Sequence, residues 1–89
     1  MFSPFLSDLI IGKWTTGSVT VEFLKDGTMK STSQGKTEVL GYKFLESHMI
    51  EIGVSGHPTT WQSYNIDISG KSLTLTQTKI GSPIVYTKD

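Results

Sequence analysis

Short segments of alternating apolar and polar residues fill most of this chain, and turn-forming residues separate them at nearly regular intervals. The separators are Gly17-Ser18, Asp26-Gly27, Gln34-Gly35, Glu46-Ser47, Gly56-His57-Pro58, Ser69-Gly70 and Gly81-Ser82-Pro83. A period of two is typical of strands that bury one face, and such turns connect neighbouring strands. The pattern therefore predicts an all-β, antiparallel up-and-down meander of about eight strands.

The predicted strands have apolar residues at alternate positions, which we expect to point inward. The strands cover residues 12–16, 19–24, 28–33, 38–45, 49–54, 60–68, 72–78 and 84–87. The expected inward residues are Phe23, Met29, Leu40, Tyr42, Phe44, Ile50, Ile52, Tyr64, Ile66 and Leu75. A meander with one apolar face buries it by closing on itself, so residues 1–89 are expected to form a single small barrel domain.

A short helix is predicted over residues 3–10, because Ser3 is a good helix cap and Pro4 suits the first helical position. Phe5 and Leu9 stand four residues apart and would share the face that packs on the barrel. Alternate turns of a meander lie at the same end, so the helix would close the end that holds the tight turns. The turns at 17–18, 34–36 and 81–83 and the connection at 55–59 would form an open end.

Two strands also predict that the barrel closes incompletely. Strand 28–33 is mostly polar and strand 84–87 is short. An exposed edge strand favours a homodimer or the capture of an extended peptide, because its backbone groups are unpaired.

Gly12-Lys13-Trp14, directly after the predicted helix, resembles the Gly-x-Trp motif on the first strand of lipocalins, which belong to the calycin superfamily. The segment Glu22-Phe23-Leu24-Lys25-Asp26-Gly27-Thr28 is similar to a hairpin of short bacterial lipocalin-like domains of unassigned function. The resemblance implies a lipocalin-like barrel in which Trp14 packs across the closed end. It gives structural roles to Gly12 and Trp14, as the tight hairpin does to Asp26 and Gly27. Lipocalins have an arginine that packs on this tryptophan, whereas this chain contains no arginine.

Composition excludes several classes of partner. The 89 residues include eight basic and eight acidic side chains, so the formal net charge is zero. A nucleic-acid-binding domain usually carries a basic surplus, and we expect no such partner. No apolar run approaches the ~18 residues of a membrane-spanning helix, so we expect no membrane span. Residues 1–11 lack the basic start of a signal peptide, which predicts a cytoplasmic location.

Candidate binding residues lie inside the barrel and at its expected open end. An eight-stranded barrel has an interior just wide enough for its own side chains or for one small ligand. If a pocket remains, an apolar guest would be oriented by Tyr42, Tyr64 or Gln77. His57 and Trp61 flank a proline-containing turn, and they form either a binding patch or, for Trp61, a cover on the barrel rim.

No motif for catalysis or metal binding is present. The chain has no cysteine and no Gly-x-Ser-x-Gly, and its two histidines fall in turns at opposite ends. We therefore predict no catalytic residue, metal ligand or cofactor. The main hypothesis is a non-catalytic binding or interaction module that acts through rim loops or an edge strand. The alternative is a carrier or sensor of a small apolar ligand held inside the barrel, and an enzyme without a recognisable motif is a third.

Overall fold

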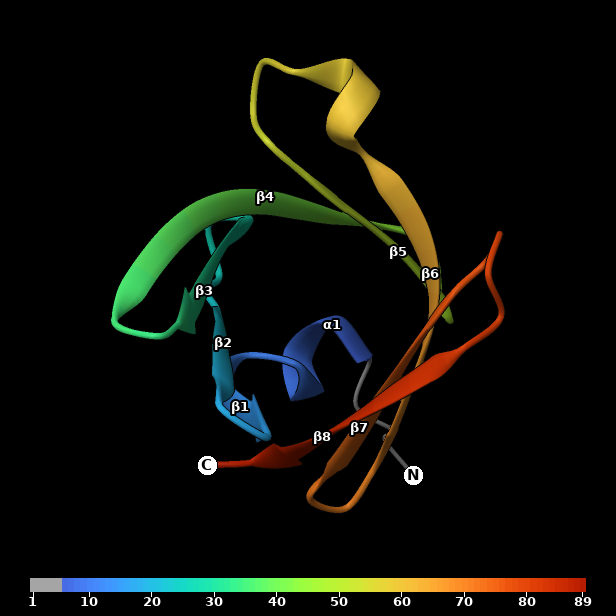
Figure 1. The fold of residues 1–89 in the computed structure, drawn as a ribbon. Helices are drawn as coiled ribbons and strands as arrows, with labels where there is room; N and C mark the ends of the chain where they lie inside the picture. The colour runs from blue at the N-terminus through green and yellow to red at the C-terminus, as the bar shows by residue number, and fades with distance from the viewer. Residues whose placement is uncertain (1–5) are drawn as a thin grey trace.

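Eight antiparallel strands, each paired with its neighbours in the chain, form a closed up-and-down barrel in the computed structural model, which describes residues 6–89 (Figure 1). The strands are β1 (Gly12–Thr16), β2 (Val19–Phe23), β3 (Thr28–Ser33), β4 (Lys36–Glu46), β5 (Met49–Gly53), β6 (Gln62–Ser69), β7 (Ser72–Gln77) and β8 (Pro83–Lys88). The all-β meander predicted from the alternating pattern is confirmed, and so is its closure into a barrel.

The expectation of an open edge is wrong. β3 pairs with β2 on one side and with β4 on the other, although its side chains are mostly polar. β8 is longer than predicted and pairs with both β7 and β1. Strand pairing uses backbone groups, which are the same in a polar strand as in an apolar one. The seam between β1 and β8 is short, with Trp14 opposite Lys88 and Thr15 opposite Thr87.

Two short helical segments accompany the barrel in residues 6–89. The helix predicted over residues 3–10 is not shown as such: its expected start at Ser3-Pro4 lies outside the described residues, and the described part is one turn, α1 (Leu6–Leu9). Leu9, expected on the packed face, is 40% exposed. Ile10 takes that place and is fully buried, because the turn presents the following residue to the barrel interior.

The predicted strand 60–68 begins later than expected. A 3-10 turn, η1 (Pro58–Thr60), precedes it, and the Thr60 amide donates a hydrogen bond to the His57 carbonyl at 3.1 Å. Proline suits the first position of such a turn, so the chain becomes extended only after Thr60. In Figure 1 this connection projects away from the barrel.

β4 is long and strongly curved, and it contributes to two parts of the wall (Figure 1). Its first half pairs with β3 and its second half with β5, and Gly41 lies opposite Thr28 on one side and Gly53 on the other. The register with β5 shifts between Phe44 and Glu46, as expected for a bulge that adds curvature.

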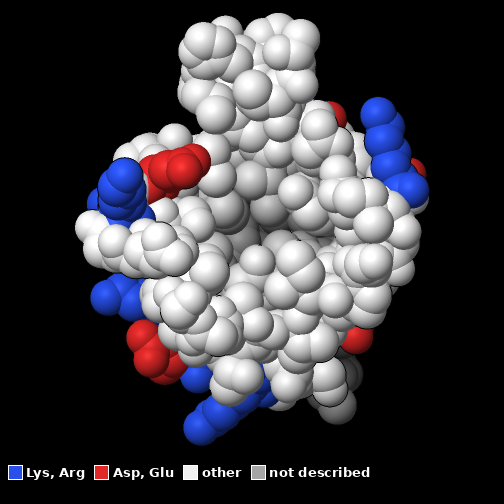
Figure 2. All heavy atoms as spheres, in the orientation of Figure 1, with Lys and Arg blue, Asp and Glu red and all other residues white. Residues whose placement is uncertain are grey.

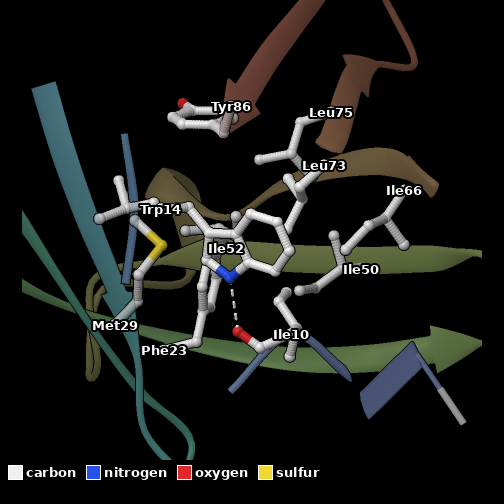
Figure 3. Close-up of a cluster of buried hydrophobic side chains, with 11 residues drawn as sticks. Ile10, Trp14, Phe23, Met29, Ile50, Ile52, Ile66, Leu73, Leu75 and Tyr86 are labelled. Atoms are coloured by element: carbon white, nitrogen blue, oxygen red, sulfur yellow. Dashed lines mark hydrogen bonds between the residues drawn. The ribbon is translucent and has the colours of Figure 1, made fainter. Parts of the chain in front are cut away.

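The core fills the barrel at the end that α1 covers. Its largest fully buried side chains belong to one cluster around the indole of Trp14, and Figure 3 shows them converging from several strands. They are Trp14, Phe23, Ile10, Ile50, Ile66 and Leu73. Every residue expected to point inward belongs to this cluster or packs against it.

Candidate functional site

The end of the barrel next to α1 is closed by Trp14. Its indole Nε1 donates a hydrogen bond of 2.8 Å to the Ile10 carbonyl, which fixes the chain before β1 across the barrel (Figure 3). The Lys88 ammonium lies 4.7 Å from the centre of the indole and donates a hydrogen bond of 2.8 Å to the Ile11 carbonyl. One side chain of the last strand therefore joins the seam, the tryptophan and the N-terminal segment.

Gly12 is required by this arrangement for two reasons. Its φ of +125° is unfavourable for residues with a side chain. A Cβ at this position would also collide with the Lys88 ammonium group.

The β2–β3 hairpin is stabilised by its own turn residues. The Asp26 carboxylate accepts a hydrogen bond of 2.9 Å from the Thr28 amide, and Gly27 has a φ of +90°. Hydrogen bonding by Thr28 holds the pKa of Asp26 below its ordinary value. The structure thus places Asp26 and Gly27 in a tight turn.

An apolar cavity of about 150 Å³ lies inside the barrel. It is lined by Val21, Phe23, Met29, Leu40, Ile52, Tyr64, Leu75, Ile84 and Tyr86. Figure 2 shows a hollow at the centre of the barrel seen end on, and uncharged side chains surround it in that view. The exposed Ile84 belongs to the lining, so the cavity communicates with the surface.

Two phenols supply the polar groups of this lining. Tyr64 comes from β6, and Tyr86 comes from β8, where it lies opposite Leu73 of β7. Burial raises the pKa of Tyr86, and the neighbouring Tyr64 raises it further. Tyr86 is therefore protonated at neutral pH, and its hydroxyl is able to donate a hydrogen bond.

Tyr42 is not part of this lining. Its hydroxyl donates a hydrogen bond of 2.6 Å to the Leu24 carbonyl, and its ring packs edge-on against Phe23 with centroids 5.1 Å apart. It borders an open depression of about 430 Å³ on the surface, which Asp8 and Lys25 also line. The structure therefore separates Tyr42 from Tyr64, although both are predicted to point inward and to orient a guest.

Gln77 lies close to Tyr64 but is engaged with another side chain. It stands opposite Tyr64 in the β6–β7 register, and its Nε2 donates a hydrogen bond of 2.9 Å to Gln62 Oε1. Gln62 and Gln77 thus occupy the next inward-facing positions of β6 and β7, beyond Tyr64 and Leu75 of the apolar lining.

His57 and Trp61 lie in different surroundings. His57 is exposed on the projecting connection, whereas the half-buried Trp61 turns back onto the barrel wall. Trp61 Nε1 donates a hydrogen bond of 3.1 Å to the Val54 carbonyl. A Cβ on Gly53 would lie 2.6 Å from Cγ of Trp61, and one on Gly41 would lie 3.1 Å from its Cη2. The ring thus covers this glycine pair, and Lys43 Nζ lies 5.8 Å from its centroid.

The sequence pattern does not point to Tyr86, which lines the cavity, or to Lys88, which packs on Trp14. Both stand at alternate positions of β8, in step with Ile84. Extending the predicted strand 84–87 by one residue places Lys88 on the same face as Tyr86, which is the signal that identifies it.

Comparison with known proteins adds no assignment. No protein-family model matches the sequence, and no curated protein matches it. Within residues 6–89, no three histidine or carboxylate side chains are placed to hold a metal ion. No helix in that part of the chain is long and apolar enough to cross a membrane.

Proposed function

We propose that this barrel binds a small apolar molecule in the cavity lined by β2–β8. The observation that carries the proposal is an apolar cavity of about 150 Å³ inside a closed barrel whose other end is filled by Trp14 and its neighbours. A site closed at one end holds a guest by burial, and burial of apolar surface is the main source of affinity for such molecules.

The size of the cavity defines the guest. An apolar cavity of about 150 Å³ accommodates a benzene ring, and its opening beside the exposed Ile84 leaves room for a small substituent on that ring. None of the residues that line this cavity is charged at neutral pH. A charged guest would lose its hydration without compensation, so the guest is neutral.

A lipocalin-like architecture is part of the same proposal. Lys88 packs on Trp14 and bonds the segment before β1, which is the place that the resemblance assigns to an arginine. A cation on this tryptophan supports a shared closed end with that family.

The interaction module acting through rim loops has less support. Its aromatic anchor, Trp61, is turned against Gly53 and is bonded to Val54. Binding of a partner through an exposed edge strand has no support, because both β3 and β8 are paired on two sides. A homodimer or a protein partner remains an outcome of the test below.

The test is a titration of the isotope-labelled protein with toluene, followed by amide chemical shifts. We expect saturable shifts at lining residues, with a dissociation constant on the order of 0.1–1 mM, since tiny ligands have few atoms to contribute. Ile84→Trp places a large ring at the lining and should weaken binding at least tenfold. Val85→Trp is the matched control, because Val85 is the neighbouring exposed residue of β8 and is absent from the lining.

The proposal fails if toluene produces no saturable shifts, or if the two variants weaken binding equally. Native mass spectrometry of the protein from its own source complements this titration. A monomer with a reproducible small adduct supports the proposal, whereas an assembly without an adduct favours the interaction module.

A further inference from the structure

We infer that the preferred guest carries a hydrogen-bond-accepting oxygen, such as the carbonyl of a small neutral ketone, ester or aldehyde, and that the Tyr86 hydroxyl recognises it with Tyr64 as a second donor. This inference rests on the proposed function, and it adds the polar group that selects among apolar molecules of similar size.

The first support is the state of the Tyr86 hydroxyl. The residue is 9% exposed, yet its hydroxyl makes no hydrogen bond to any other residue between 6 and 89. Buried tyrosine hydroxyls usually find a partner, because an unpaired polar group in an apolar place is costly. Within the described residues, no side-chain oxygen or nitrogen is both sealed from solvent and unpaired. The Tyr86 hydroxyl is therefore reached from the cavity or the surface, and an occupant or water completes it.

The second support is the presence of both tyrosines among the residues that line the cavity. Tyr64 and Tyr86 are the lining residues whose side chains bear a polar group; the others are aliphatic, aromatic or thioether. The Tyr64 hydroxyl likewise makes no hydrogen bond within the described chain. Tyr42 shows the contrast, because its hydroxyl is already donated to the Leu24 carbonyl. Two free donors in an otherwise apolar cavity set both the chemistry and the orientation of a guest.

The direction of the hydrogen bond follows from the environment. Tyr86 is protonated at neutral pH, because burial raises its pKa further above the ordinary value of 10.0, so its hydroxyl is available as a donor and the guest group we assign to it is an acceptor. The lining offers no cation that would favour a carboxylate, so the acceptor is a neutral oxygen.

Two isosteric probes test this inference directly. Acetophenone has a carbonyl oxygen at the position where α-methylstyrene has a methylene group. Both compounds are titrated into the wild-type chain and its variants. Tyr86→Phe should weaken acetophenone binding about three- to tenfold, as expected for one neutral hydrogen bond, and leave α-methylstyrene within about twofold. Tyr64→Phe should act in the same direction. Tyr42→Phe is the matched control and should change neither affinity, because its hydroxyl is committed outside the lining.

The outcomes separate this inference from the proposed function. If α-methylstyrene binds but neither Tyr86→Phe nor Tyr64→Phe discriminates between the probes, the inference is overturned and the apolar site stands. If neither probe binds the wild-type chain, both are overturned. Each phenylalanine variant lacks a single oxygen, and amide spectra of the free variants establish that they retain the fold.

Discussion

Replacement of Lys88 by methionine tests how the barrel is closed. Lys88→Met keeps an unbranched side chain of similar length and removes the ammonium group. The variant therefore loses two contacts at once: the cation 4.7 Å from the Trp14 ring and the hydrogen bond of 2.8 Å to the Ile11 carbonyl. Packing of the apolar stem is largely retained, so the change isolates the charge.

The magnitude follows from these two contacts. A cation over an aromatic ring contributes about 0.5–2 kcal/mol, and a hydrogen bond from a charged donor about 1.5–3 kcal/mol. Lys88 is only half-buried, and its ammonium group regains hydration when the contacts are lost, so the lower part of the combined range applies. We expect a loss of about 2 kcal/mol in the free energy of unfolding. For a chain of 89 residues, that is a large fraction of the roughly 5–13 kcal/mol expected in total.

Urea denaturation monitored by tryptophan fluorescence measures this loss. With a slope of about 1–2 kcal/mol per molar urea, the midpoint of Lys88→Met should fall by about 1–2 M. Lys88→Arg preserves both contacts and should stay near wild type. Lys13→Met is the matched control, since Lys13 is exposed on the adjacent strand β1, and it should change stability by less than about 0.5 kcal/mol. A Lys88→Met midpoint equal to that of wild type, or equal to that of Lys13→Met, would refute this account of closure.

Two further predictions concern the wall and the hairpin. Gly53→Ala should lower the free energy of unfolding by about 1–3 kcal/mol, because the added Cβ meets both Cγ and Cα of Trp61. Gly41→Ala is the control and should cost less, because its Cβ meets the far edge of the Trp61 ring. Equal urea midpoints for the two variants would contradict this reasoning. Asp26→Asn should lose the stability that comes from the lowered pKa of Asp26. That contribution is complete above the ordinary value of 3.8 and disappears as pH falls through the lower folded pKa, so wild type and variant should converge in acid; a constant difference in urea midpoint from pH 2 to 7 would contradict it.

Local sequence patterns predict most strands of the barrel wall. They fail where a residue contacts partners that are far away in the sequence. Asp26-Gly27 forms the expected tight turn, because the Thr28 amide that completes it is two residues away. The position of Trp61 shows the opposite case. The sequence around Pro58 predicts that Trp61 lies at the barrel rim. In the structure its ring packs on the wall, because the paired Gly41 and Gly53 have no side chains to occupy that space.

The candidate site was likewise predictable only in part from local sequence patterns. Tyr42 and Tyr64 both occupy inward positions of their strands, and the alternating pattern treats them as equivalent. The register of the barrel places the Tyr42 hydroxyl at the Leu24 carbonyl and leaves Tyr64 in the cavity. Tyr86 enters the same lining because β8 runs to Lys88 and closes against β1.

The class of fold, the order of the strands and most of the inward residues follow from the order of residues along the chain, since side-chain alternation and turn chemistry are local properties. Closure of the barrel, the cavity and the choice of tyrosines that line it depend on contacts such as that between Lys88 and Ile11, which are 77 residues apart. The register of strands so far apart is decided by how all eight pack together around Trp14. No pattern in a short window contains that information.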